Sequence, residues 1–172
     1  VSPFEMANVC LEINTTRDIG RQILRHRSFS FQEFSQRYAN VDHLGDWQLR
    51  EARLQDSMNR QNSIAVNTDD DDHRMLVSGW NTMQLDAARR CLDAYHWAIE
   101  SGIAKEQARA LLPEGLTPSR MYMNGTMRSW VHYLKQRLHP STQKEHRDIA
   151  QQVLTTLRTV APVTMDAFFG DT

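Results

Sequence analysis

Residues 75–102 (MLVSGWNTMQLDAARRCLDAYHWAIESG) decide the fold class, because they predict one long amphipathic helix. Their apolar residues recur at steps of three and four, which is the period of a helix with one buried face. The apolar positions are Trp80, Met83, Ala87, Cys91, Ala94, Tyr95, Ala98 and Ile99. Gly102 favours a helix end at that point. We therefore expect a long helix whose apolar stripe lies in the core.

The acidic run 69–72 (DDDD) directly precedes this helix. Carboxylates also bind Ca²⁺ or Mg²⁺, but this run lacks the alternating ligand spacing and the central glycine of a calcium loop. Negative charge at a helix start is stabilised by the helix dipole. We therefore interpret the run as a solvated helix start, and we expect no metal site.

The rest of the chain predicts shorter elements. Apolar and β-branched residues alternate over residues 9–15 and predict a strand. Helices are predicted over residues 17–26, 105–112, 126–138 and 141–160, with one helical turn over 166–169. An ordered loop is predicted over residues 27–42, and a loop with one or two short strands over 45–63. The expected fold is α+β: a predominantly helical single domain over residues 1–172 with a small antiparallel or mixed sheet.

The composition excludes several classes of protein. With 20 Lys and Arg residues against 21 Asp and Glu, the formal net charge is −1, so no basic field directs the chain to nucleic acid. Mean hydropathy is −0.60, and no apolar run approaches the roughly 20 residues of a membrane span. Cys10 and Cys91 are too few for a disulfide scaffold or a Cys-rich zinc module. The chain begins at Val1 without a signal peptide, so we expect a cytoplasmic protein that lacks an N-terminal segment.

Arginine dominates the basic residues. Among the 20 Lys and Arg residues, the lysines are Lys105, Lys135 and Lys144, and the others are arginines. The guanidinium fork matches phosphate and carboxylate groups and keeps its charge. This bias fits a protein that holds phosphorylated small molecules, and it fits a codon or lineage bias equally well.

The densest polar segment is residues 25–38 (RHRSFSFQEFSQRY). Arg25 and Arg27 lie two positions apart and repel each other unless an anion or an acid lies between them. The segment therefore predicts either an anion-binding site or a surface cluster of salt bridges around Glu33.

This segment resembles the signature of the flavin-dependent thymidylate synthases. The signature consists of Arg25-His26-Arg27, seven further residues and Ser35, and here Gln36-Arg37-Tyr38 follows it. Three more segments match the family in the same order. They are Ser2-Pro3-Phe4-Glu5, then Ala108-Arg109-Ala110-Leu111-Leu112-Pro113, then Arg128, Ser129, His132, Leu134, Arg137, Gln143, Glu145 and Arg147 at the family's spacings. The resemblance extends from Ser2 to Phe169.

The resemblance implies an enzyme that converts dUMP to dTMP. The carbon donor would be methylenetetrahydrofolate, and reduced FAD, regenerated by NADPH, would donate the hydride. The family works as homotetramers whose active sites are shared between subunits. By resemblance, dUMP would be held by Gln22, Arg25, Glu33, Ser35, Gln36, Arg37, Arg109 and Arg137. FAD would be held by Ser2, Arg25, His26, Arg27, Glu33, Thr126, Arg128 and His132.

The residue types suit these implied roles. Arg37 and Arg109 can clamp a phosphate dianion through forked hydrogen bonds. Arg137 and Ser35 are the expected catalytic residues: Arg137 would favour an ionised pyrimidine, and Ser35 would position the ring rather than attack it. His26 is expected either to contact the flavin or folate ring or to cap its own helix.

The helix over residues 126–138 carries two arginines that are expected to face different ligands. Arg128 and Arg137 lie nine positions apart, or about 900° of helical turn, which places them on opposite faces. This arrangement suits a site shared between subunits.

The chain departs from the family at Thr126 and His132, where Asn is frequent, at Gln32, where Asn is also frequent, and at Ser141, where His is frequent. A contact from position 141 to the nucleobase or the flavin is therefore expected to be absent.

Neither cysteine is expected to be a nucleophile. Cys10 falls in an apolar strand and Cys91 on the apolar stripe of the long helix, and burial there would raise a thiol pKa.

Two alternatives remain open. The chain could be a binding protein for a nucleotide or a flavin that has kept the pocket and lost catalysis, or a helical oligomerisation subunit with arginine salt bridges.

Overall fold

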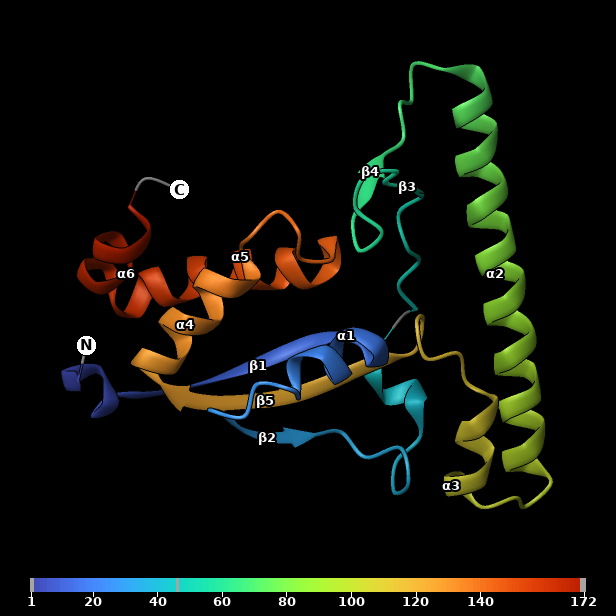
Figure 1. The fold of residues 1–172 in the computed structure, drawn as a ribbon. Coiled ribbons are helices and arrows are strands. Elements are labelled where there is room, and N and C mark those ends of the chain that lie inside the picture. The colour runs from blue at the N-terminus through green and yellow to red at the C-terminus, as the bar shows by residue number, and fades with distance from the viewer. Residues whose placement is uncertain (1, 46, 171–172) are drawn as a thin grey trace. The chain divides into compact units, whose positions relative to one another are not determined.

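A computed structural model describes residues 2–45 and 47–170 (Figure 1). Internal contacts divide the chain into two compact units. We call the first the sheet-and-helix unit; it comprises Val1–Ile13, Arg21–Gln32 and Met121–Thr172. We call the second the long-helix unit; it comprises Asn14–Gly20 and Glu33–Arg120. Each unit is built from stretches that are distant in sequence. No single linker in the sequence could therefore mark the boundary between the units.

A three-stranded sheet has the strand order β1-β5-β2. The strands are β1 (Asn8–Thr16), β5 (Pro118–Thr126) and β2 (Ser30–Glu33). The strand predicted over residues 9–15 is confirmed as β1. The central strand β5 was not predicted, and β2 contradicts the loop expected over residues 27–42.

Strand β5 escaped prediction because methionines occupy its buried positions. Met121 and Met123 are 0% exposed, whereas Arg120, Tyr122 and Asn124 between and beside them face outward. This alternation is the period of a strand with one buried face. Methionine has no strong preference for strands, so only the burial pattern reveals the element.

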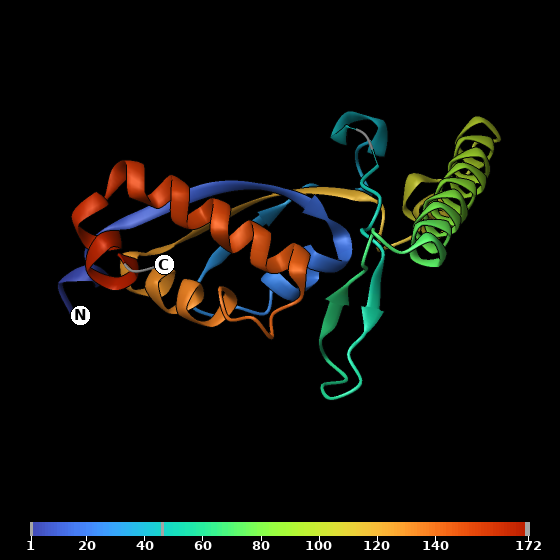
Figure 2. The same cartoon turned by 90° about the horizontal axis from the view of Figure 1, so that it is seen from above.

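Three helices of the sheet-and-helix unit lie on one side of β1 and β5 (Figures 1 and 2). They are α4 (Met127–Arg137), α5 (Lys144–Val160) and α6 (Pro162–Phe169). Each buries an apolar stripe, as the sequence predicted for α4 and α5. The fully buried members of this core include Trp130, Tyr133, Leu134, Leu154, Leu157 and Met165. Helix α6 begins earlier than the single turn predicted over residues 166–169, because Pro162 suits the first turn of a helix.

The long-helix unit is dominated by α2 (Asp71–Glu100). Asp70 caps this helix, and its side chain accepts hydrogen bonds from the backbone N–H groups of Asp72 and His73. The acidic run is therefore a helix start, as predicted. Toward its C-terminal end, α2 forms a small core with α3 (Lys105–Ala108), in which Tyr95 and Ala98 are each 1% exposed. A 3-10 turn, η3 (Arg109–Leu111), follows α3. The helix predicted over residues 105–112 is therefore an α-helix in its first half and a 3-10 helix in its second.

The apolar stripe of α2 is not buried along its whole length. Trp80 is 43% exposed, Met83 is 65% exposed, and Ala87 is also exposed, so the expectation of a continuous buried stripe was wrong there. The cysteine environments also differ from expectation, because Cys10 is exposed and Cys91 is half-buried. Periodicity identifies the apolar face of an element, but another part of the structure has to cover that face.

Five short elements complete the described structure. Strands β3 (Arg53–Gln55) and β4 (Ser63–Ala65) pair antiparallel. β3 is a short strand of the kind predicted within residues 45–63, whereas β4 begins at the last residue of that segment and continues beyond it. Turns η1 (Ser2–Glu5) and η2 (Val41–Leu44) are 3-10. Helix α1 (Arg17–Ile23) ends before the predicted residue 26. Across the described residues, no helix combines the length and the apolar character that crossing a membrane requires.

Candidate functional site

The Arg-His-Arg motif lies in successive turns after α1 rather than inside the helix. The backbone N–H of His26 donates to the carbonyl of Ile23, and that of Phe29 donates to the carbonyl of His26. Because these residues lie in turns, their side chains do not follow the angular spacing of a helix. Arg25 and Arg27 are exposed, while the His26 ring is half-buried in the sheet-and-helix unit. The motif therefore presents two cations around an inward-facing histidine.

His26 pairs with Arg137, the last residue of α4. The Arg137 Nε–H donates to His26 Nε2 across 2.9 Å. Because Nε2 is the acceptor, His26 is neutral and carries its proton on Nδ1. Burial and the nearby charge of Arg137 lower the pKa of His26 to about 4. The structure therefore brings together two of the predicted site residues, and the Nε2 atom of His26 contacts Arg137 rather than its own helix.

An aromatic cluster holds the His26 ring. Its centroid lies 4.9 Å from the ring of Tyr133 and 6.4 Å from that of Phe29, both at steep angles. Such edge-to-face contacts fix the plane of a ring. The Tyr133 hydroxyl is buried and has no hydrogen-bond partner among the described residues, and burial raises the pKa of this phenol. Rigid packing thus fixes the position of the His26 ring, whose Nε2 accepts the hydrogen bond from Arg137.

Gln22 belongs to a second polar group in the same unit. Its Oε1 lies 3.3 Å from Nδ1 of His146, and its Nε2 donates to Gln143 Oε1 at 2.7 Å. Gln143 in turn donates from Nε2 to Glu145 Oε2 at 2.9 Å. His146 is 0% exposed. Burial, then the charges of Arg137 and His26, lower its pKa to about 3.

His146 was not identified from the sequence as a candidate site residue. It lies three and four positions before Ile149 and Ala150, and seven before Val153, on the face of α5 that packs inward. A histidine on the buried stripe of an amphipathic helix was the available signal.

Other predicted residues of the sheet-and-helix unit have separate environments. Arg128 forms a 2.6 Å ion pair with Glu5. Thr126 is the N-cap of α4, where its hydroxyl oxygen accepts from the Ser129 N–H. Ser2 and His132 are exposed. Arg128 and Arg137 thus have different partners on one continuous helix, in agreement with opposite faces.

Five predicted residues fall in the long-helix unit, namely Glu33, Ser35, Gln36, Arg37 and Arg109. Arg37 and Arg109 converge on one acidic residue. Arg37 pairs with the Glu106 carboxylate at 3.4 Å, and the Arg109 Nε–H donates to the Glu106 carbonyl at 3.2 Å. The structure therefore brings these two arginines to one place.

Glu33 is held by residues outside the motif. It accepts a 2.6 Å hydrogen bond from the Ser119 hydroxyl and lies 4.0 Å from Arg17. Gln36 is buried, and its Nε2 has no partner among the described residues. Ser35 is half-buried, and its carbonyl accepts from the backbone N–H of Tyr38.

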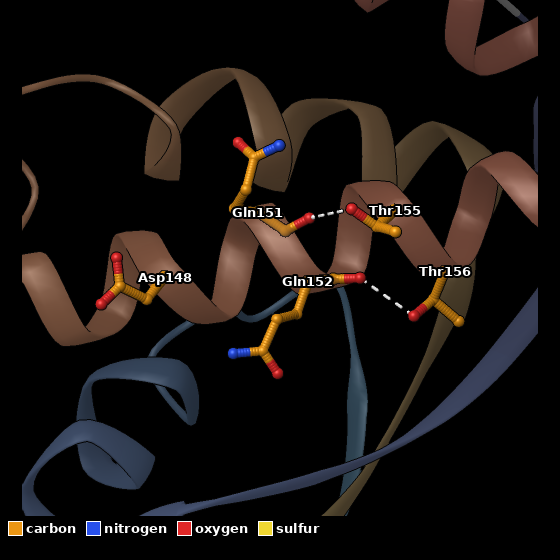
Figure 3. Close-up of a pocket in the computed structure, with 5 residues that line it drawn as sticks. All are labelled: Asp148, Gln151, Gln152, Thr155 and Thr156. Atoms are coloured by element: carbon orange, nitrogen blue, oxygen red, sulfur yellow. Dashed lines mark hydrogen bonds between the residues drawn. The ribbon is translucent and has the colours of Figure 1, made fainter.

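A hollow of about 450 Å³ lies elsewhere, on the exposed side of α5. Figure 3 shows its lining residues, Asp148, Gln151, Gln152, Thr155 and Thr156. Both threonine hydroxyls donate to carbonyls of their own helix, those of Gln151 and Gln152. The hollow contains none of the predicted site residues, so we do not assign it to the candidate site. Within residues 2–45 and 47–170, no group of three or more His, Cys, Asp or Glu residues could hold a metal ion.

The fold is of the α+β class, and its candidate site is a charged group of residues around His26. More particularly, the chain belongs to the thymidylate synthase complementing protein family, whose model matches residues 1–163. It is 46% identical over 149 residues to the probable flavin-dependent thymidylate synthase of Paramecium bursaria Chlorella virus 1. It is 48% identical over 149 residues to the flavin-dependent thymidylate synthase of Synechocystis sp.. Each match covers 87% of this chain and 65% of the relative, so the chain spans about two thirds of their length.

A solved structure also resembles this fold. The UMP/dUMP methylase PolB from Streptomyces cacaoi, bound with 5-Br UMP, superposes with a TM-score of 0.78 at 27% sequence identity. The match covers 98% of this chain and 75% of that chain. The strands and helices described above therefore recur in a nucleotide-binding relative.

Proposed function

We propose that the chain is part of a flavin-dependent thymidylate synthase that converts dUMP to dTMP. The carbon donor is methylenetetrahydrofolate, and NADPH is the reductant. The 2.9 Å hydrogen bond between Arg137 and His26 carries this proposal, since it holds the Arg137 guanidinium in a defined orientation beside the Arg-His-Arg motif. The names of the relatives and the nucleotide in the solved structure support it.

Arg137 acts on the pyrimidine ring. Its Nε–H is engaged by His26, which leaves the end-on fork formed by its two terminal nitrogens for a ligand. A half-buried guanidinium stabilises negative charge on the uracil N3 and O2 positions more strongly than one in water. That charge makes C5 of the ring a better nucleophile. Ser35 positions the ring by hydrogen bonding and forms no covalent bond to it.

Arg37 and Arg109 hold the phosphate of dUMP. The side chains of Arg37 and Glu106 are 53% and 49% exposed, so their ion pair is weak and an incoming phosphate dianion can compete with it. Gln22, Arg25, Glu33 and Gln36 complete the proposed dUMP set.

The chemistry of the donor set fits a flavin dinucleotide. Arg25 and Arg27 are exposed cations on adjacent turns, which suits a diphosphate. His26 keeps its Nδ1 proton available for a ring acceptor. The other proposed contacts are Ser2, Glu33, Thr126, Arg128 and His132. Thr126 is already used as a helix cap and Arg128 is paired with Glu5, so we expect these two to contribute less. When bound, FAD supplies the hydride.

The enzyme works as a cytoplasmic homotetramer with shared sites. Large apolar side chains exposed on α2 support an assembly, because exposed apolar surface can mark an interface. They are Met75, Leu76, Trp80, Met83, Leu85 and Trp97.

One experiment separates the proposal from its alternatives. The purified protein should be yellow, and NADPH should bleach its flavin absorption faster when dUMP is present, with dTMP formed once methylenetetrahydrofolate is added. A protein that binds dUMP but never bleaches would be a binding protein without catalysis. A colourless protein that binds neither ligand would be a structural subunit. UMP in place of dUMP tests whether the chain, like the UMP/dUMP methylase PolB by its name, accepts both nucleotides.

A further inference from the structure

We propose that His146 is a positioning residue that fixes the side-chain amide of Gln22 for nucleotide binding. This inference rests on the proposed function, because Gln22 is one of the residues assigned to dUMP. His146 belongs to α5, outside the Arg-His-Arg motif. It lies 124 residues from Gln22 in sequence, so only the fold brings the two together.

The hydrogen-bond chain has one direction. His146 Nδ1 donates to Gln22 Oε1, Gln22 Nε2 donates to Gln143 Oε1, and Gln143 Nε2 donates to Glu145 Oε2. A carboxylate can only accept, so Glu145 sets the orientation of both amides. Because Gln22 must then present Oε1 to His146, the histidine has to carry its proton on Nδ1.

The surroundings of His146 keep it neutral. Tyr133, His26 and Arg137 are the titratable or charged groups around the ring: the Tyr133 centroid lies at 5.8 Å and that of His26 at 6.2 Å, and Arg137 is close enough to disfavour the imidazolium. A second positive charge beside Arg137 and without a carboxylate partner would be costly in a buried site. His146 therefore acts as a fixed neutral donor.

The other ring nitrogen argues against a role in stability. His146 Nε2 is buried without a hydrogen-bond partner among the described residues, and such an atom is destabilising. An apolar residue at this place would remove that cost. The presence of a histidine here is better explained by the hydrogen bond that its Nδ1–H donates to Gln22.

Matched variants test the position of the donor. Asn places an amide nitrogen near the Nδ1 site of histidine, Gln reaches the Nε2 site, and Leu has no donor. In the flavin-loaded protein we expect His146→Leu and His146→Gln to raise the Kd for dUMP at least fivefold, while His146→Asn stays within twofold of the wild type. His146→Leu should melt at the same temperature as the wild type or higher. Gln151→Ala, on the exposed side of α5, should change neither quantity.

A double variant tests the route through Gln22. Adding His146→Leu to Gln22→Ala should not raise the Kd further, because the amide that His146 positions is already gone. Equal dUMP affinity in wild type and His146→Leu, or equal loss in the Asn and Gln variants, would overturn the inference alone. Failure of the wild-type protein to bind dUMP would instead remove the proposed function, and the inference with it.

Discussion

Arg137 and His26, 111 residues apart in sequence, are joined by a hydrogen bond from Nε to Nε2. The bond makes a neutral histidine the acceptor for a permanently charged guanidinium. It leaves the terminal nitrogens of Arg137 for another ligand and fixes the tautomer of His26. Two motifs that are separate in the sequence are thus joined by a hydrogen bond in the fold.

Arg137→Ala should lower turnover more than flavin retention. Loss of a forked donor from a partly desolvated site costs about 2–4 kcal/mol of transition-state stabilisation, or roughly thirtyfold to a thousandfold in kcat. Single-turnover rates per bound flavin measure this loss. Lys144→Ala, a surface cation paired with Asp148, is the control and should retain full activity. A variant that loses FAD while keeping its turnover per bound flavin would mean that Arg137 serves the cofactor.

The protein should lose stability as the pH falls below about 6.5. The folded-state pKa values of His26 and His146, about 4 and about 3, lie below the ordinary value of 6.5. Between these limits the unfolded chain binds more protons than the folded one, so the free energy of unfolding decreases with decreasing pH. Urea titrations from pH 7.5 to 4.5 measure the slope. The double variant His26→Gln, His146→Leu should have a clearly shallower slope than the wild type, and an unchanged slope would contradict the assignment.

Two glycine substitutions should change stability in opposite directions. A Cβ at Gly125 would lie 2.4 Å from Cδ1 of the buried Phe29 ring, so Gly125→Ala should cost about 1–3 kcal/mol by overpacking. A Cβ at Gly79, inside α2, meets nothing within 4 Å. Gly79→Ala should therefore stabilise the protein by roughly 0.5–1 kcal/mol. Thermal unfolding of the two variants side by side checks both signs.

The double change Cys10→Ser, Cys91→Ser should keep dTMP formation within about tenfold, because neither cysteine lies in a polar sequence motif with a neighbouring base. Cys10 is exposed and Cys91 half-buried, so the packing loss should be small. Activity is measured per bound flavin. If the double variant stays folded, yellow and able to bind dUMP yet forms no dTMP, a thiol takes part in the reaction.

Light scattering should give four times the chain mass of 20.0 kDa at micromolar concentration. Met83 is 65% exposed on α2, and Met83→Glu should weaken the assembly by placing a charge in an apolar interface. Met58→Glu, at a methionine that is 94% exposed between β3 and β4, is the matched control. A wild-type monomer that still holds flavin would exclude the shared-site proposal.

The sequence by itself determined the elements whose signal is local. The apolar periods of α2, α4 and α5, the capping run before α2 and the alternation of β1 depend on neighbouring residues, so they could be predicted. Boundaries shifted by a few residues, as at α1, which ends at Ile23 and is followed by turns. The motif spacings also placed the chain in its family, because they are properties of the linear sequence.

Only the tertiary structure decided which distant residues meet. Strand β5 owes its place to hydrogen bonding with β1 and β2, which are nearly a hundred residues away in sequence, and its methionines give no local strand signal. The exposure of Met83 and Cys10 depends on what covers each face. In the sequence, His146 is only one position on the apolar stripe of α5, and its contact with Gln22 is seen only in the fold. Periodicity is set by bonds along the chain, whereas pairing and burial are set by contacts across it, and those contacts are what orient Arg137 and Gln22.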